Sequence, residues 1–301
     1  MTAVSSIDLH VHTTCSDGTL TPEETVAEAA RLGLAAIAIA DHDITDGIAP
    51  AAAAARAARL GLIPAVEINT DYRGTEVHVL GYFIATEDGG LQESLRRLRE
   101  GRRERNRRIL ERLRALGRPV EEERVLELAG EGSVGRPHIA QALVEAGYVQ
   151  SVHDAFARYL SRGRSAYVER YRVTPAEAIE MVQRAGGLAA LGHPAKVGRD
   201  GLIPELVKAG LAALEAYHCD HTPADTARYL DLARRFNLLV TGGTDSHGPH
   251  SDKPVALGSV PVPGAVGERL LAARGLDLAA AQRLGYWSAR PWRAGYARFS
   301  E

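Results

Sequence analysis

Short apolar runs alternate with helix signals along most of the chain, and this alternation restricts the fold more than any other feature. Runs typical of buried strands cover residues 6–12, 34–40 and 62–68, and segments with helical character separate them. Strands that are separated by helices pair in parallel through right-handed crossovers. The sequence therefore predicts an α/β fold, either a closed barrel or an open doubly wound sheet.

Two helix starts carry the same capping signal. Thr21 and Thr174 are each followed by proline at the first helical position and by glutamate three residues on. After the second start, strands are predicted over 188–193, 211–217 and 238–247. The alternating run 75–83 follows the turn sequence "DYRG", so it is predicted to pair with the strand before it. Six or seven such units favour a closed barrel.

The middle of the chain has a different character. Leucine and isoleucine recur at helical spacing from 91 to 116, and residues 96–114 contain ten arginines and three glutamates. No strand signal appears between about 88 and 165. We therefore expect a barrel made of residues 1–88 and 165–301, interrupted by a helical insertion at 89–164.

The composition argues against several classes of protein. The formal net charge of -2 gives no basic field for nucleic acid, and no apolar run has the length of a membrane span. The two cysteines, Cys15 and Cys219, do not form a disulfide framework, and the N-terminus lacks a signal peptide pattern. We expect a cytoplasmic protein with no membrane association and no obligate protein partner.

Histidine and carboxylate side chains stand at the C-terminal ends of nearly all the predicted strands. His10 and His12 share one face of the first strand because they are two residues apart. Sites gather at these strand ends in both candidate architectures. Buried carboxylates need compensating charge, and mixed histidine and carboxylate ligands suit Zn²⁺, Mn²⁺ or iron. The sequence therefore predicts a metal site at this edge, where the strand ends carry His10, His12, Asp17, His42, Glu67, His78, His193, Asp245 and His247, with Asp41 and Asp43 flanking His42.

Six motifs carry a resemblance to a known family. In chain order they are "DLHVHTTCSDGTLTPEE", "ADHDITDG", "PAVEIN", "VHVLGY", "LGHP" and "TGGTDSHG". The chain resembles the polymerase and histidinol phosphatase (PHP) superfamily, and within it the TrpH-like metal-dependent phosphoesterases that act on 3′,5′-bisphosphonucleotides and short oligonucleotides. The resemblance implies a distorted (β/α)7 barrel, a trinuclear metal centre at its mouth and an insertion that covers the mouth.

The resemblance also implies a ligand set for two to three ions of manganese, zinc or iron per chain. One ion would be held by His10, His12, Glu67 and Asp245. A second would be held by Glu67, His78 and His193, with Glu67 bridging the two. A third would be held by Asp17, His42 and His247. We expect Glu67, His193 and Asp245 to serve catalysis, through a hydroxide that bridges two ions.

Several further residues are candidates for substrate contact. Arg136 stands between Gly135 and Pro137 at a predicted helix start, where a guanidinium and a helix N-terminus can share a phosphate. Most of the arginines at 96–114 are predicted to lie on a solvent-exposed helix face. His153 and His250 are predicted to be surface residues. The other candidate substrate contacts are His138, Arg103, Lys196, His218 and His221.

A few residues near the metal motifs have competing interpretations. Asp41 and Asp43 could orient the imidazole of His42 or cap the following helix. Asp46 is predicted as the N-cap of the alanine-rich helix, and Cys15 as a small filler. The aromatic and basic segment "YWSARPWRAGYARF" is predicted to pack on the barrel.

We expect a metal-dependent phosphoesterase that removes the 3′-phosphate of nucleoside 3′,5′-bisphosphates and leaves the 5′-monophosphate. A 5′→3′ exonuclease acting on short RNA or DNA is the first alternative. Histidinol phosphatase, an amidohydrolase acting on a C–N bond and a non-catalytic metal-bound scaffold are further alternatives. The amidohydrolase reading is weakened because Glu67 stands where those enzymes place a lysine.

Overall fold

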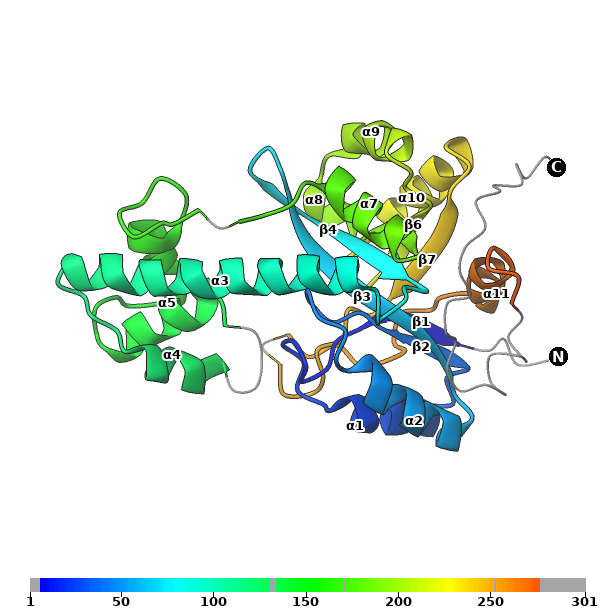
Figure 1. Ribbon diagram of the computed structural model, residues 1–301, viewed down its shortest axis with the longest axis horizontal. Coiled ribbons are helices and arrows are strands. Elements are labelled where there is room, and N and C mark those ends of the chain that lie inside the picture. Colours follow the sequence, from blue (N-terminus) through cyan, green and yellow to red (C-terminus); the bar gives the residue numbers. More distant parts are fainter. Residues whose placement is uncertain (1–5, 130–133, 170, 252, 277–301) are drawn as a thin grey trace.

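The computed structural model describes residues 6–129, 134–169, 171–251 and 253–276. Seven strands form one sheet in sequence order, which curls into a nearly closed barrel (Figure 1). Backbone hydrogen bonds tie the first strand to the segment after the last, from Asp245 N–H to the His10 carbonyl and from His12 N–H to the Ser246 carbonyl. The strands are β1 (Ile7–Val11), β2 (Ala36–Ile39), β3 (Gly61–Tyr72), β4 (Thr75–Tyr82), β5 (Leu188–Leu191), β6 (Ala213–His218) and β7 (Leu239–Gly243). The predicted (β/α)7 architecture is confirmed.

One strand runs against the predicted parallel pattern. β3 and β4 form the expected hairpin, whose turn uses positive φ at Arg73 and Gly74. The hairpin reverses β4, and the helical segment that follows returns the chain to β5, so β4 is antiparallel to β5 as well. The expectation of parallel pairing is wrong at this one place, and it holds for the β1–β2, β2–β3, β5–β6 and β6–β7 pairs.

The helices around the barrel begin largely as predicted. Thr21 and Thr174 make complete capping boxes, and Thr222 makes a third. Asp46 is not the N-cap of the alanine-rich helix: Gly47 holds that position, and Ile48 N–H bonds the Thr45 carbonyl, so the backbone turn replaces a side-chain cap. These helices are α1 (Pro22–Arg31), α2 (Ile48–Ala58), α7 (Pro175–Arg184), α8 (Pro194–Val197), α9 (Ile203–Lys208), α10 (Pro223–Arg235) and α11 (Gly264–Ala272), with a short 3₁₀ turn at Asp200–Leu202.

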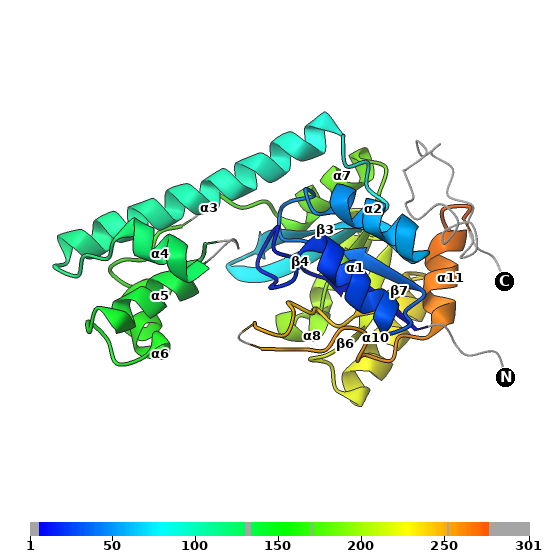
Figure 2. The ribbon, with the colours of Figure 1, turned by 90° about the horizontal axis from the view of Figure 1, so that it is seen from below.

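The described residues between β4 and β5 form helices joined by turns and loops. The long helix α3 projects away from the barrel and carries the smaller helices on its far half (Figures 1 and 2). Its N-terminal leucines pack with the barrel core, whereas Ile109 and Leu113 belong to a separate hydrophobic cluster with the smaller helices. The elements are α3 (Gly89–Ala115), α4 (Glu122–Ala129), α5 (Arg136–Glu145), α6 (Val152–Ala155) and a π-helical turn at Phe156–Leu160.

The N-terminal end of the barrel is filled, which leaves the opposite end for a site. Ile7, Leu9 and Tyr82 are buried there, and the Tyr82 hydroxyl donates to the Leu9 carbonyl at 2.9 Å. Helix α11 packs against this end, with Gly267 in close approach to Ile7. Among the described residues, no helix is both long enough and apolar enough to span a membrane.

Candidate metal centre

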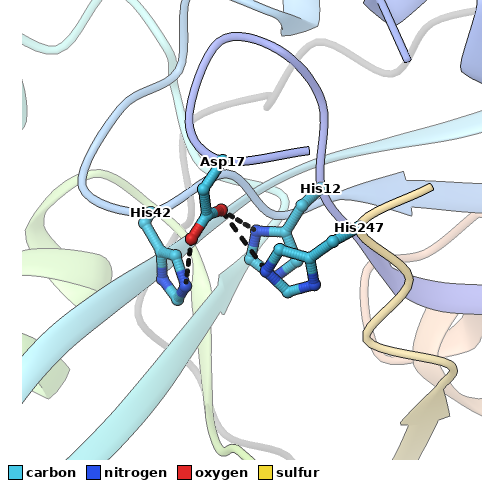
Figure 3. Close-up of side chains that lie close together, drawn as sticks. All are labelled: His12, Asp17, His42 and His247. Carbon is cyan, nitrogen blue, oxygen red and sulfur yellow. Dashed lines mark ion pairs between the residues drawn. The ribbon is translucent and has the colours of Figure 1, made fainter. Parts of the chain in front are cut away.

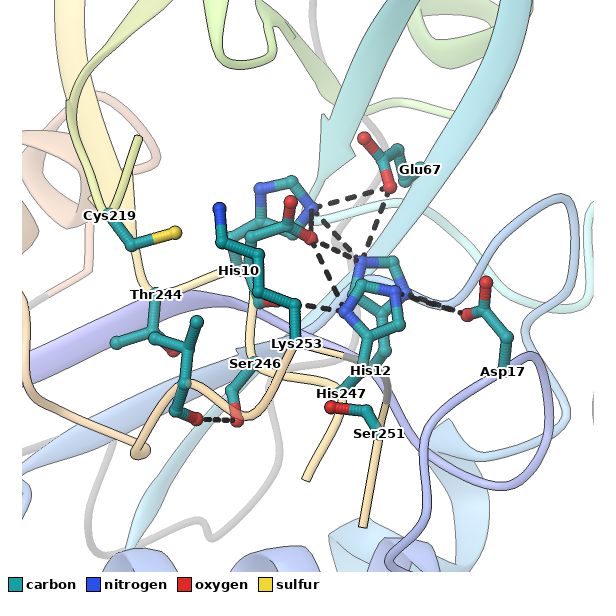
Figure 4. Close-up of polar contacts among 12 residues, drawn as sticks. His10, His12, Asp17, Glu67, Cys219, Thr244, Ser246, His247, Ser251 and Lys253 are labelled. Carbon is teal, nitrogen blue, oxygen red and sulfur yellow. Dashed lines mark hydrogen bonds and ion pairs between the residues drawn. The ribbon is translucent and has the colours of Figure 1, made fainter. Parts of the chain in front are cut away.

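His10 on β1 and His12 directly after it meet a buried carboxylate. His10, His12 and Glu67 are almost fully inaccessible to solvent, and their side chains face one another (Figure 4). The two Nε2 atoms lie 3.2 Å apart, and each lies 3.3 Å from Glu67 Oε2. Asp245 Oδ1 approaches the same two nitrogens at 3.5 and 3.1 Å. These four residues are the set predicted for the first ion, and the structure brings them together.

Glu67 also contacts three imidazoles from other elements. His42 Nδ1 lies 3.0 Å from Glu67 Oε2. His78 Nδ1 and His193 Nε2 lie 2.6 and 3.0 Å from Oε1, and 3.1 Å from each other. The residues predicted for the second ion are therefore mutually in contact. Because the two oxygens of Glu67 face different groups of imidazoles, its carboxylate stands between two candidate ion positions.

The third predicted set lies beside the first. Asp17 extends from the loop after β1 toward His42 and His247, with an Asp17 Oδ2–His42 Nε2 distance of 3.6 Å and an Asp17 Oδ1–His247 Nε2 distance of 3.3 Å (Figure 3). His12 Nδ1 joins this group at 3.8 Å from Asp17. His12 therefore faces two candidate positions, which the sequence did not indicate.

The carboxylates of the cluster change the pKa values of the neighbouring histidines. Burial alone would lower the pKa of His12, but Asp245 and Glu67 outweigh it and raise that pKa to about 10. Burial likewise opposes protonation of His78, but Glu67 raises its pKa to about 10. Burial lowers the pKa of His193 to about 4. His193 and His78 both contact Glu67, so only one of the two imidazoles is protonated beside this carboxylate.

The carboxylates respond in the opposite sense. Burial would raise the pKa of Glu67, but His78, His42 and His10 hold it well below its usual range. Asp17 and Asp245 behave in the same way next to their own histidines. The carboxylates are therefore ionised at neutral pH, as metal ligands must be.

The donor set fits divalent transition metals. Imidazole nitrogens and carboxylate oxygens are mixed in each group, which suits zinc, manganese and iron rather than calcium. Buried side-chain atoms normally have a hydrogen-bond partner, yet Glu67 Oε2, Asp17 Oδ1 and His12 Nδ1 have none. These three atoms all face the cluster, so each could coordinate a bound cation.

Three buried carboxylates that are not predicted ligands hold the ligand-bearing segments in place. Asp8 accepts hydrogen bonds from Thr244 N–H, Thr244 Oγ1 and Gly258 N–H, and so fixes the segment that carries Asp245. Asp41 accepts from Thr13 N–H, Thr13 Oγ1 and Ser16 Oγ, and so fixes the loop that carries Asp17. The third is Glu215, on β6. The sequence did not identify Asp8 and Glu215, although each is a lone carboxylate within an apolar run.

Asp41 and Asp43 are therefore neither helix caps nor direct partners of an imidazole. Asp43 accepts from Asn69 N–H and Nδ2, and Arg102 Nη2 donates to it at 2.6 Å. Asn69 Nδ2 also lies 3.4 Å from His42 Nδ1, so Asp43 reaches His42 only through this amide. Both carboxylates hold loops, and that role needs contacts distant in sequence.

Close backbone approach shapes two of the ligand segments. A Cβ on Gly243 would lie 2.4 Å from the His10 nitrogen, so only glycine lets β7 approach β1 here. His193 and Asp245 have positive φ angles of 26° and 53°, a strained conformation that concentrates at functional sites.

A cavity of about 600 Å³ opens beside the cluster. Asp17, His42, His78 and His247 form part of its wall, and the helical segment contributes three arginines, Arg102, Arg105 and Arg136. Arg136 stands at the first turn of α5, where its guanidinium packs over the Phe156 and Tyr167 rings and donates to the Leu160 carbonyl. His138 lines the same cavity, and its Nδ1 accepts from Gly135 N–H.

Three other candidate substrate contacts do not line this cavity. Arg103 lines a neighbouring hollow of about 470 Å³, not this cavity, because α3 turns Arg102 and Arg105 toward the cluster instead. Lys196 Nζ and His218 Nε2 each lie 3.3 Å from Asp245 Oδ2.

Three further histidines lie outside the cluster of predicted ligands. His221 points away from the cluster, and its Nδ1 lies 3.0 Å from the Ala216 carbonyl oxygen. His153 is exposed, as predicted, and His250, also exposed, lines the 600 Å³ cavity. The segment "YWSARPWRAGYARF" lies outside the described residues.

Comparison with known proteins identifies the family. The PHP domain model matches residues 8–172. The 5′-3′ exoribonuclease Rnm of Escherichia coli is 37% identical over 252 residues, which cover 80% of this chain and 85% of that protein. The 3′,5′-nucleoside bisphosphate phosphatase of Chromobacterium violaceum is 32% identical over 82% of this chain and 88% of its own length.

Solved structures agree with this assignment. A candidate metal-dependent phosphoesterase from Bifidobacterium adolescentis matches with a TM-score of 0.76 and 34% identity, over 89% of this chain and 96% of that one. A protein of Chromobacterium violaceum named as an amidohydrolase, with bound sulfate and no metal, matches with a TM-score of 0.74 and 30% identity over the same shares. The chain belongs to the PHP domain family and is a metal-dependent phosphoesterase.

Proposed function

We propose that this protein hydrolyses the 3′-phosphate of nucleoside 3′,5′-bisphosphates to give the 5′-monophosphate and inorganic phosphate. The observation that carries the proposal is a buried cluster of histidines and carboxylates around Glu67, set against a cavity wall with three arginines. The cluster suits the scissile phosphate, and the arginines suit the second phosphate of the same nucleotide. A relative that is 32% identical is named for this reaction.

The proposed ion ligands are the nine residues of the cluster. His10, His12, Glu67 and Asp245 would hold one ion, Glu67, His78 and His193 a second, and Asp17, His42 and His247 a third. Ions of manganese, zinc or iron, when bound, supply Lewis acidity and positive charge for the attack of water on phosphorus. We place Glu67, His193 and Asp245 closest to the reacting atoms.

The residues of the cavity wall would bind and orient the substrate. Arg136 and Arg105 present guanidinium groups that can bind phosphate oxygens in pairs. Arg136 also lies at the N-terminus of α5, whose backbone N–H groups favour an anion. The helical segment 89–164 would thereby cover the mouth of the barrel, as the resemblance led us to expect.

A second candidate function is 5′→3′ exonuclease activity on short oligonucleotides. It is favoured by the hollow of about 470 Å³, which shares His42 and Arg102 with the main cavity and also contains Arg99 and Arg103. The two spaces together offer room for more than one nucleotide. The Escherichia coli relative is named for this activity.

A substrate panel tests the proposal. Each substrate is assayed by its own product: inorganic phosphate from nucleoside 3′,5′-bisphosphates and from histidinol phosphate, 5′-mononucleotides from 5′-phosphorylated di- and trinucleotides, and free amine from an amide substrate. The proposal expects the highest kcat/KM for the bisphosphates. Preference for the oligonucleotides would support the exonuclease instead, and preference for histidinol phosphate or the amide would overturn both.

We also propose a cytoplasmic location. Cys15 and Cys219 are both free cysteines, and free thiols are typical of a reducing compartment. The partners that we propose are a small nucleotide or short oligonucleotide as substrate and inorganic phosphate as product.

A further inference from the structure

Glu215 lies beneath the cluster of predicted metal ligands but is not one of them. It is the only carboxylate of β6 and is completely buried. A buried carboxylate is costly unless its oxygens are bonded to charged or polar partners. The partners of its two oxygens therefore indicate what keeps it there.

Each oxygen of Glu215 contacts a different predicted ligand. Oε1 lies 2.9 Å from His10 Nδ1, and Oε2 accepts from the backbone N–H of His193 at 2.6 Å. His10 turns its other nitrogen, Nε2, toward Glu67 and Asp245. His193 has the strained φ of 26°, and its backbone bond to Glu215 holds that conformation.

These two contacts reach two different ion positions. His10 belongs to the group with His12 and Asp245, whereas His193 belongs to the group with His78, and Glu67 stands between them. A carboxylate that accepts from Nδ1 fixes the imidazole tautomer that leaves Nε2 free for a metal, and such outer partners typically change metal affinity by about 10–100-fold.

We propose that Glu215 is a positioning residue that sets the ring of His10 and the backbone of His193, and thereby couples the first and second ion positions. The inference rests on the proposed function only in taking the cluster to hold metal ions. It adds a residue from a strand that carries none of the nine proposed ligands.

The test is the Zn²⁺ affinity of Glu215→Gln, measured by competition with a chelator. Glutamine keeps the shape of the side chain but has one acceptor oxygen, so it cannot accept from both His10 and His193. We expect the affinity to fall by about 10–100-fold for two of the bound ions together. Zn²⁺-loaded, ¹⁵N-histidine-labelled protein should also lose or shift the His10 Nδ1–H resonance.

Two further variants make the result interpretable. Glu205→Gln is the control for the loss of one carboxylate charge, because Glu205 is exposed and accepts a hydrogen bond from the Tyr72 hydroxyl rather than from a predicted ligand. It should change the affinity far less. Glu215→Asp keeps the charge but is one methylene shorter, so it should weaken binding less than Glu215→Gln and also serves if glutamine prevents folding.

The outcomes separate the two proposals. Wild-type protein that binds no Zn²⁺ would overturn the metal centre and the proposed function together. Wild-type binding with an unchanged affinity and His10 resonance in Glu215→Gln would overturn only the positioning role. Equal losses in Glu215→Gln and Glu205→Gln would also overturn it, because a general charge effect would then explain both.

Discussion

At the scale of single residues, Glu67 lies at the centre of the histidine cluster. Its carboxylate is buried and lies within 3.3 Å of imidazole nitrogens from His10, His12, His42, His78 and His193. Removing one charge from such a cluster affects all the ions that it would hold. Replacing the carboxylate by a neutral group should therefore weaken the binding of those ions.

Glu67→Gln is therefore expected to lower kcat for a nucleoside 3′,5′-bisphosphate by several orders of magnitude while the fold survives. Steady-state kinetics and thermal unfolding check the two parts of this prediction. A variant that kept a tenth of wild-type turnover with its metal content unchanged would contradict the bridging role.

Arg136 tests the recognition of the second phosphate. Hydrogen bonds to charged groups contribute about 1.5–3 kcal/mol, so Arg136→Ala should lower kcat/KM for a 3′,5′-bisphosphate by about 10–100-fold. A monophosphate ester that lacks the second phosphate should be affected much less.

Arg118→Ala is the control for the packing of Arg136. The Arg118 guanidinium also stacks on an aromatic ring, 5.4 Å from the Tyr148 centroid, but it lines neither the cavity nor the hollow. It should leave both substrates unaffected. Equal losses of Arg136→Ala on both substrates would mean that this arginine serves the scissile phosphate or the fold.

The protonation of the cluster predicts a pH dependence of metal binding. The pKa values of His12 and His78, raised to about 10 in the metal-free protein, mean that both are protonated at pH 7.5. A metal must displace these protons, so binding should release protons and its affinity should rise with pH toward about pH 10. Calorimetry in two buffers of different ionisation enthalpy measures the release. Binding with no proton release at pH 7.5 would contradict these pKa values.

The same shifts set the stability of the metal-free protein. Raised histidine pKa values stabilise the fold fully below the unfolded pKa of about 6.5, and that contribution is lost as the pH rises to about 10. The lowered carboxylate pKa values act at the other end, and their contribution is lost as the pH falls through the acidic range.

At the scale of elements, loops after the strands place the ligands, and buried carboxylates hold the loops. Asp41 fixes the turn that carries Asp17 through three short hydrogen bonds from Thr13 and Ser16. Gly18 is required in this turn, because a Cβ there would lie 2.7 Å from the carbonyl of His12. A third ion held by Asp17 would therefore depend on this turn.

Asp41→Asn should reduce the bound metal by one equivalent and leave the other ions in place. The amide introduces donors opposite the donors of Thr13, so the turn loosens. Elemental analysis after gel filtration measures the change, and Asp46→Asn, an exposed position in the neighbouring loop, is the control. Loss of all the metal, or of none, would contradict this local role for Asp41.

The sequence predicted the elements whose cause is local. Threonine, proline and glutamate at fixed spacing produced the capping boxes at Thr21 and Thr174, and apolar runs produced the strands. The N-cap of α2 was mispredicted because the Thr45 carbonyl replaced the side chain of Asp46, which depends on the turn geometry. The reversal of β4 against β5 likewise depends on where a long helical segment returns the chain.

At the scale of the whole molecule, the barrel explains why the ligand residues could be recognised. Parallel strands bring their C-terminal ends to one mouth, so histidines and acids far apart in sequence converge there. Contacts among those side chains, such as His12 facing two candidate ion positions or Glu215 behind His10, need the closed barrel and were not visible in the sequence. The choice of Arg102 and Arg105 over Arg103 follows from the rotation of α3 about its axis.

The most direct test of the central claim combines metal analysis with phosphate release. Purified protein should contain two to three equivalents of manganese, zinc or iron by elemental analysis. Chelation should abolish phosphate release from a nucleoside 3′,5′-bisphosphate, and adding back Mn²⁺ should restore it. Metal-free protein that hydrolyses the bisphosphate at the wild-type rate would contradict the claim.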